Sequence, residues 1–167
     1  MLLIVDRLKS LSFGSLMELY RESNQWNGEE FYRLETPERQ LALAEERFYQ
    51  YLREDFFSKP GAKYYIWMES GEYVSALRLW RWQDGFLLEG LETKPERRRK
   101  GYAARLIQGV QELALPGTRI YSHVSRKNLA SMSLHEGCGF RVVQESARCL
   151  DGSVSSGIMT LCWEKGK

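Results

Sequence analysis

The sequence predicts an α/β fold in one domain, with a mixed, mostly antiparallel central sheet of about six to seven strands flanked by about four helices. Three observations predict this class. A strand, a basic turn and an amphipathic helix follow one another between residues 87 and 113; β-rich runs joined by tight turns precede them; and strand and helix patterns alternate after them. With 167 residues, 43% of them hydrophobic, the chain is long enough for one core, and we expect a single domain over residues 1–167.

The first part of the chain is expected to form a strand and a short helix. Residues 2–5 are apolar and predict the strand. Ser12 is a suitable N-cap for a helix that runs to Tyr20, with apolar side chains on one face. Residues 24–28 interrupt the helical pattern, so we expect a break in regular structure there.

A longer helix and an antiparallel meander follow. Thr36 and Pro37 are typical of a helix start, and an apolar stripe at helical spacing continues to Phe56, before Pro60-Gly61 ends the helix. The next strands are separated by turns of the kind found in hairpins. They are expected at residues 64–68, 73–82 and 87–91.

The C-terminal half alternates between helix and strand. Gly101 precedes a helix whose apolar residues recur at three- and four-residue spacing, and Pro116-Gly117 ends it. Asn128 opens a further helix, and Asp151-Gly152 is expected to turn the chain into its last strand. The strands in this half are expected at residues 120–124, 139–143 and 158–163.

The turn before Gly101 carries the clearest functional signal. Gly101 can adopt backbone angles closed to other residues, and Ala103 is small enough for a ligand to approach the main chain. The N–H groups at a helix start have no internal partner and lie at the positive end of the helix dipole, so they bind phosphate readily. The basic residues 97–100 lie directly upstream and add positive charge.

The spacing Arg98-x-x-Gly101-x-Ala103, with Pro95 three residues before the arginine, resembles the acyl-CoA signature of the GNAT superfamily of N-acetyltransferases. A second block, residues 128–140, is similar to the family's other signature: an asparagine, a helix with an acid-bearing position seven residues later, and a closing Gly-Phe. The blocks have the order and separation of the family, and the expected element order matches the GNAT topology.

The resemblance implies an N-acetyltransferase that uses acetyl-CoA as co-substrate and acetylates a primary amine, in a small molecule or a peptide, by direct transfer in a ternary complex. It also implies that residues 91–93 pair with the pantetheine arm, that the amides of residues 99–103 hold the pyrophosphate, and that Asn128 holds the arm from the other side. The implied cofactor-binding residues are Leu91, Glu92, Thr93, Arg98, Arg99, Lys100, Gly101, Tyr102, Ala103, Asn128, Ser131 and His135.

Three residues are candidates for catalysis. In family members the position of His135 is usually a tyrosine, whose hydroxyl is thought to protonate the CoA sulfur. An imidazolium, with a reference pKa of about 6.5, is also a competent acid, and packing at the helix end is the alternative role. His123 is a candidate general base, and Glu92 on the neighbouring strand competes with it. The choice stays open, because a bulge would change which side chains face the cleft.

Two rival functions belong to other classes. One is a sensor that binds acyl-CoA without turnover, and the other is a nucleic-acid-binding module that uses residues 97–100 with Trp80 and Trp82. A net charge of +2 is too balanced for a typical nucleic-acid binder, so we expect no nucleic acid as partner. The two tryptophans are expected to pack on one sheet face.

Other parts of the sequence limit the compartment and the partners. Three cysteines without Cys-x-x-Cys spacing predict neither a disulfide framework nor a metal site. The apolar residues 1–5 are too few for a signal peptide or a membrane span, so we expect no membrane partner and a cytoplasmic location. A homodimer is left open. By resemblance, the acceptor pocket would be built from about residues 26–35 and 150–156, which are the least patterned segments.

Overall fold

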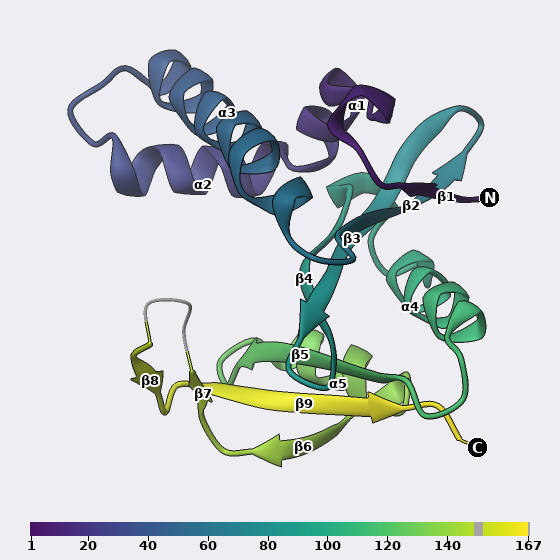
Figure 1. The fold of residues 1–167 in the computed structure, drawn as a ribbon. Helices are drawn as coiled ribbons and strands as arrows, with labels where there is room; N and C mark the ends of the chain where they lie inside the picture. The colour runs from purple at the N-terminus through teal and green to yellow at the C-terminus, as the bar shows by residue number, and fades with distance from the viewer. Residues whose placement is uncertain (149–151, 167) are drawn as a thin grey trace.

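The computed structural model describes residues 1–148 and 152–166, and its centre is a seven-stranded sheet in the order β1-β2-β3-β4-β5-β9-β6 (Figure 1). Neighbouring strands in this sheet pair antiparallel, except that β4 pairs parallel with β5. The predicted fold class, a mixed and mostly antiparallel sheet with flanking helices, is confirmed. The strands are β1 (Leu2–Val5), β2 (Lys63–Glu69), β3 (Glu72–Trp82), β4 (Gly85–Thr93), β5 (Arg119–Ser125), β6 (Arg141–Gln144) and β9 (Ile158–Glu164).

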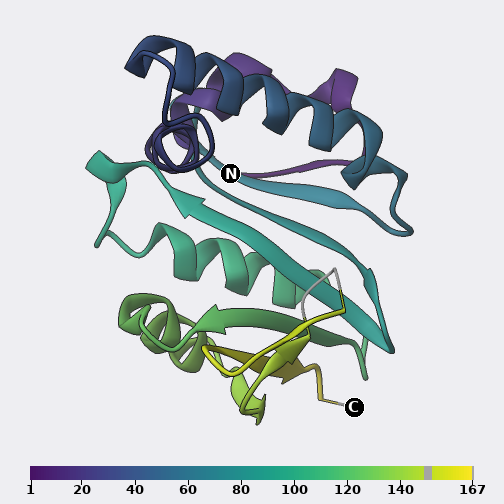
Figure 2. The same ribbon diagram turned by 90° about the vertical axis from the view of Figure 1, so that its left-hand side faces the viewer.

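Helices cover both faces of the sheet. Figure 2 shows the first three helices on one side of strands β1–β4 and the fourth helix on the other side. None of the helices in the described ranges is long and apolar enough to cross a membrane. The helices are α1 (Phe13–Leu19), α2 (Arg21–Phe31), α3 (Pro37–Glu54), α4 (Tyr102–Leu113) and α5 (Leu129–Gly137), with short 3-10 turns at Leu8–Ser10, Phe56–Ser58 and Pro95–Arg97.

The two faces of the sheet have separate cores, because side chains alternate between the faces along each strand. On the α1–α3 face, Leu16 and Leu52 pack with Tyr64 and other buried residues of β2 and β3. On the α4 face, Leu106 and Ile107 pack with buried residues of β3, β4, β5 and β9. The sheet is therefore covered on both faces at β2 and β3, whereas β4 and β5 contribute buried residues to the core on the α4 face.

The break predicted at residues 24–28 is wrong, because these residues lie inside α2. Asn24 and Gly28 are the buried residues of this helix. A Cβ atom added at Gly28 would lie 2.7 Å from the main-chain oxygen of Gln40 on α3, so the absent side chain is what lets α2 and α3 approach closely. Packing against α3 thus stabilises a helix whose own sequence is a weak helix former.

The C-terminal part contains a small hairpin that the sequence analysis did not predict. The strands β7 (Ala147–Arg148) and β8 (Val154–Ser155) form a two-stranded sheet of their own. The strand expected from Gly139 begins at Arg141 instead, because Gly139 has a φ of +84° and belongs to the preceding turn. The predicted turn at Asp151-Gly152 lies partly outside the described residues.

One break in the sheet positions the site. The parallel contact joins Phe86–Leu88 of β4 with Ile120–Ser122 of β5 and goes no further. Past Leu88, the described chain gives β4 no strand partner on its β5 side. The same end of β4 carries a bulge opposite Ala76 and Arg78, where Gly90 has a φ of +61°. The two strands therefore diverge where β4 is most irregular.

Candidate active site

A pocket of about 670 Å³ lies between the divergent end of β4, the start of α4 and the start of α5. All the residues predicted to bind the cofactor line it, except Lys100 and His135. The sequence analysis did not assign cofactor binding to five further residues that line it, Arg97, Ala104, Ala130, Ser133 and Leu134. The predicted members are Leu91, Glu92, Thr93, Arg98, Arg99, Gly101, Tyr102, Ala103, Asn128 and Ser131.

The start of α4 presents main-chain N–H groups to this pocket. Gly101 is the N-cap residue in the left-handed conformation, with a φ of +80°, and no side chain caps the helix. Arg99 also has a positive φ of 62°. Such a turn costs a non-glycine residue free energy, and it leaves the first amides of α4 without a side-chain acceptor. The geometry is that of an anion-binding helix start.

The four basic residues before Gly101 differ in their partners. Arg97 forms ion pairs with two glutamates of β2 and β3, each at 3.4 Å. Arg98 forms an ion pair with Glu92 at 3.2 Å and another with a glutamate of α2, and Lys100 donates to a main-chain carbonyl at 3.1 Å. Within the described ranges no ion pair involves Arg99, which lines the pocket. Arg99 is therefore the cation best placed to meet an incoming anion.

Asn128 lies on the opposite wall, at the start of α5. Its Oδ1 atom accepts a hydrogen bond of 3.0 Å from the main-chain N–H of Ser131, so the residue is the N-cap of this helix. The amide nitrogen of the same side chain has no part in that bond and remains available as a donor.

His135 is buried in α5 and does not line the pocket. Its side chain is 2% exposed, and its ring meets Phe140 edge to face at 5.1 Å between centroids. The Nδ1 atom lies 2.8 Å from the carbonyl oxygen of Ser131, which accepts only, so the ring proton belongs on Nδ1. The Nε2 atom is buried without a partner in the described chain, and burial lowers the pKa of the ring.

A second group of polar and aromatic side chains lies on the α1–α3 face, beside the point where β4 and β5 diverge. His123 on β5 meets Trp82 edge to face at 5.3 Å between ring centroids. Its Nε2 atom is buried and has no hydrogen-bond partner in the described residues. Burial lowers the pKa of His123, although the negative charge of Glu89 opposes this change. The imidazole is therefore neutral at neutral pH and can accept a proton.

Glu89 on β4 is a member of this group that the sequence analysis missed. Its carboxylate accepts a hydrogen bond of 2.5 Å from the Tyr51 hydroxyl of α3, and it lies 3.4 Å from the guanidinium of Arg78. Arg78 itself is enclosed by aromatic rings of α3 and β2. A Glu-Gly step inside an otherwise apolar strand is the signal that could have indicated a bulge and a functional carboxylate here.

Glu92 lies on the same face of the sheet as Glu89. Glu89 pairs with Arg78 and Glu92 pairs with Ala76, and these two partners are two residues apart on β3, so they share a face. The bulge in β4 is what puts two residues three positions apart on one side. Its carboxylate forms an ion pair with Arg98, and both residues line the pocket between β4, α4 and α5. Burial raises the pKa of Glu92, and the charge of Arg98 lowers it by a smaller amount. The two candidate bases from the sequence thus lie on different strands and in different surroundings.

The segment expected to build the acceptor pocket is partly exposed. Trp26 is 73% exposed and Phe31 is 55% exposed, both on α2. A smaller pocket of about 280 Å³ between α2 and α3 is lined by Phe31, Tyr32 and Tyr51, among others. In the other expected segment, residues 150 and 151 lie outside the described residues, and β8 occupies Val154–Ser155.

The tryptophans of β3 do not form a surface with the basic turn. Trp80 packs against the α1–α3 core, and the ammonium of Lys59 lies over its ring. Trp82 faces Tyr121 and His123. The expectation that both tryptophans pack on one sheet face is confirmed.

The described sheet diverges at the parallel contact between β4 and β5, and the uncapped start of α4 lies at the pocket beside this opening. A comparison with known protein families identifies the class of protein that has this arrangement. The model of the Acetyltransferase (GNAT) family matches residues 17–140, and the chain belongs to this family. It is therefore an acyltransferase.

Solved structures show the same fold at low sequence identity. The PaiA N-acetyltransferase from Thermoplasma acidophilum, in complex with coenzyme A, is 16% identical with a TM-score of 0.61, over 98% of this chain and 99% of that one. The ribosomal-protein-S18-alanine N-acetyltransferase from Escherichia coli is 14% identical with a TM-score of 0.61, over 100% and 96%. An aminoglycoside 6'-acetyltransferase type Ii is 14% identical with a TM-score of 0.65, over 98% and 96%. Among curated proteins, no match is found.

Proposed function

We propose that this chain is an N-acetyltransferase that moves an acetyl group from acetyl-CoA directly to a primary amine while both substrates are bound. The observation that carries the proposal is the position of two features, the start of α4 and the side chain of His123. The pocket with the uncapped start of α4 includes residues 91–93 of β4, past the last β4–β5 pair, and His123 is the next residue of β5 after that pair. Its Nε2 atom has no hydrogen-bond partner among the described residues. These positions support an anion-binding site and a base near the point where the two strands diverge.

The residues of the pocket fit a CoA thioester. The first amides of α4 suit a pyrophosphate, as does the guanidinium of Arg99, which forms no ion pair in the described part of the chain. Gly101 and Ala103 leave room for the ligand to approach the main chain. The main chain of residues 91–93 has no strand partner on its β5 side within residues 1–148 and 152–166, so it suits an extended amide-containing arm. When bound, acetyl-CoA supplies an acetyl group that is activated as a thioester.

The protein must also polarise the thioester carbonyl. Main-chain N–H groups at the divergent end of β4 are suited to this, because they are fixed by the pairing of β4 with β3 on the other side. The Tyr20 hydroxyl donates to the carbonyl of Gly90 and so ties the bulge to the end of α1. A fixed donor needs no reorganisation when negative charge develops on the carbonyl oxygen.

His123 is the base that we assign to the amine. A primary amine arrives mainly as an ammonium ion and must lose a proton before it can attack a carbonyl. The neutral ring of His123 can take that proton on Nε2, and the carboxylate of Glu89 stabilises the imidazolium that results. Glu92 is less suited, since its carboxylate is already the counter-ion of Arg98.

The acid that returns a proton to the CoA sulfur is the less supported assignment. His135 can donate from Nε2 only after it gains a second proton, which burial disfavours. Its described contacts, with Phe140 and Ser131, support packing at the helix end more directly than proton transfer. The acid role of His135 stays a prediction, as do the cytoplasmic location and the oligomeric state.

Thiol release tests the proposal. The purified protein is incubated with acetyl-CoA and a panel of primary amines that includes polyamines, aminoglycosides and peptides with free N-termini, and free thiol and acetylated amine are measured together. We expect thiol release that depends on an amine, with one acetylated amine for each thiol. Binding of acetyl-CoA without amine-dependent release across the panel would favour a sensor, and an acetylated protein in the absence of amine would contradict direct transfer.

A further inference from the structure

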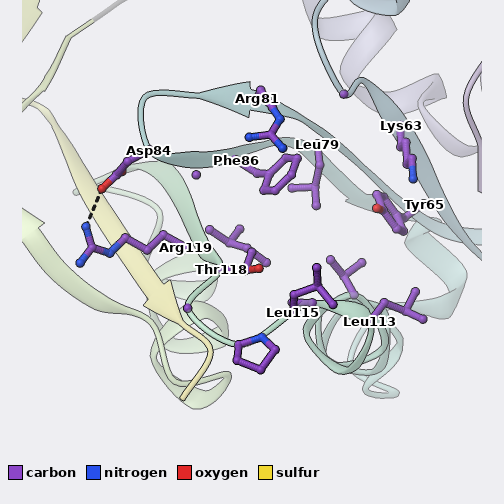
Figure 3. Close-up of a pocket in the computed structure, with 17 residues that line it drawn as sticks. Lys63, Tyr65, Leu79, Arg81, Asp84, Phe86, Leu113, Leu115, Thr118 and Arg119 are labelled. Atoms are coloured by element: carbon purple, nitrogen blue, oxygen red, sulfur yellow. Dashed lines mark hydrogen bonds and ion pairs between the residues drawn. The ribbon is translucent and has the colours of Figure 1, made fainter. Parts of the chain in front are cut away.

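A second pocket, of about 620 Å³, lies on the α4 face of the sheet between the start of β4, the end of α4 and the loop formed by residues 114–118 (Figure 3). It shares no lining residue with the pocket assigned to acetyl-CoA. The proposed acetyl transfer uses none of its residues.

Apolar side chains line about half of this second pocket. Leu79 and Val110 form buried parts of the wall, and Phe86 is half-buried. Leu113 is 57% exposed and Leu115 is 75% exposed, and Figure 3 shows both on the side of the pocket opposite Arg81. Two neighbouring large apolar side chains so exposed beside an apolar wall indicate a surface that a ligand can cover.

The rim carries two positive charges that form no ion pair among the described residues. Arg81 and Lys63 are exposed, and within the described ranges neither forms an ion pair with a carboxylate. The guanidinium of Arg81 lies 5.4 Å from the ring centroid of Phe86, which holds it over the apolar wall. Arg119 differs, because it forms ion pairs with Asp84 at 2.5 Å and with Glu164 at 2.9 Å.

We propose that this pocket binds a small amphipathic carboxylate, with the carboxylate on Arg81 and Lys63 and the apolar body against Phe86, Leu113 and Leu115. A guanidinium matches a carboxylate with two parallel hydrogen bonds. The volume lies within the range of small-molecule sites, and apolar side chains beside charged groups suit a ligand that has one apolar and one charged part. The charge complementarity therefore selects an organic acid over a neutral or cationic molecule.

The test uses decanoate as the probe, with decanol and decylamine as controls of the same chain length. Binding to the full-length protein is followed by calorimetry and by chemical-shift changes. We expect decanoate to bind in the presence of saturating acetyl-CoA, with shifts confined to the lining residues. Affinity should fall by about tenfold or more in a Lys63→Gln, Arg81→Gln double variant and in a Leu113→Ser, Leu115→Ser double variant. All four positions are exposed, so thermal unfolding should stay unchanged in both variants.

Three results would overturn the proposal. Equal binding of decanol would show that the cations play no part. Competition between decanoate and acetyl-CoA would place the probe in the cofactor pocket. Absence of decanoate binding, together with a concentration-dependent dimer that the leucine variant abolishes, would assign the surface to a second copy of the chain. None of these results depends on amine acetylation, so the proposal can fail while the proposed function holds.

Discussion

The rings of Trp82 and His123 meet edge to face across the β3–β4–β5 part of the sheet, with centroids 5.3 Å apart. This contact holds the imidazole on the α1–α3 face, where burial lowers its pKa and its Nε2 atom has no partner in the described chain. A buried nitrogen without a partner costs free energy in the absence of a ligand. A substrate amine would supply the missing partner.

The pH dependence of the reaction should report this histidine. A base must be unprotonated, and the folded pKa of His123 lies below its usual value of about 6.5. The value of kcat/KM should therefore be at its maximum above about pH 6.5 and should fall as the pH drops through the lowered pKa of His123. This fall is the acidic limb of the pH profile. His123→Gln should remove this limb and reduce kcat/KM by roughly 100-fold. Trp82→Phe is the matched control and should keep the limb. Retention of the limb in His123→Gln, with its loss in Glu92→Gln, would assign the base to Glu92.

The contact between Glu89 and Arg78 should contribute to stability. Glu89→Gln removes the carboxylate partner of a nearly buried guanidinium, and we expect a loss of roughly 2 kcal/mol, below the value for a fully buried pair because the Glu89 side chain is 21% exposed. Tyr51→Phe removes one hydrogen bond and should cost about 1 kcal/mol. Urea unfolding measures both. Glu54→Gln, in an exposed ion pair, is the control and should leave stability unchanged; an equal loss in Glu89→Gln and Glu54→Gln would refute the pairing.

The basic residues before α4 should differ in their effect on cofactor binding. Arg99→Gln should weaken acetyl-CoA binding by about tenfold and reduce its dependence on salt, because Arg99 lines the pocket and has no carboxylate partner among the residues that the structure describes. Lys100→Gln should have little effect, since its ammonium contacts a main-chain carbonyl outside the lining. Dissociation constants for acetyl-CoA, measured for both variants at two salt concentrations, distinguish the two effects. Equal losses in the two variants would show a diffuse charge effect.

His135 has two testable roles. If it is the acid, His135→Phe should lower kcat far more than it raises the KM for acetyl-CoA and should change the pH–rate profile. His135→Tyr, which restores the residue usual in the family, should then retain turnover. An unaltered pH–rate profile in His135→Phe would leave packing as its role. In that case stability should also become less sensitive to acid: a histidine with a lowered folded pKa stabilises the fold above about pH 6.5, and that contribution is lost as the pH falls.

The sequence predicted most of the residues that line the pocket between α4 and α5, because two of its walls are helix starts. Gly101 and Asn128 are the N-cap residues of α4 and α5, and a helix start is recognisable from neighbouring residues. The sequence did not predict where β4 diverges from β5. The divergence depends on where two strands distant in sequence stop pairing, and no local pattern records that point.

The acceptor side depends on long-range packing and was predicted less completely. The sequence suggests that Gly28 breaks a helix, but in the structure its missing side chain lets α2 pack closely against α3. Glu89 became significant only when Tyr51 and Arg78, from two other elements, were found beside it. Glu89 and Glu92 share a face of the sheet only because a bulge between them shifts the alternation of β4.

Acetyl-CoA binding to two glycine variants tests the central claim most directly. Gly101 and Gly71 have φ values of +80° and +81°, and a Cβ atom at either would meet nothing within 4 Å. Valine at either position should therefore cost a similar amount, about 1–2 kcal/mol of backbone strain. Only Gly101 lines the pocket. In calorimetric titrations we predict one acetyl-CoA site in the unmodified protein and in Gly71→Val, and at least about tenfold weaker binding in Gly101→Val. Equal binding in the two variants, or no binding to the unmodified protein, would contradict the account.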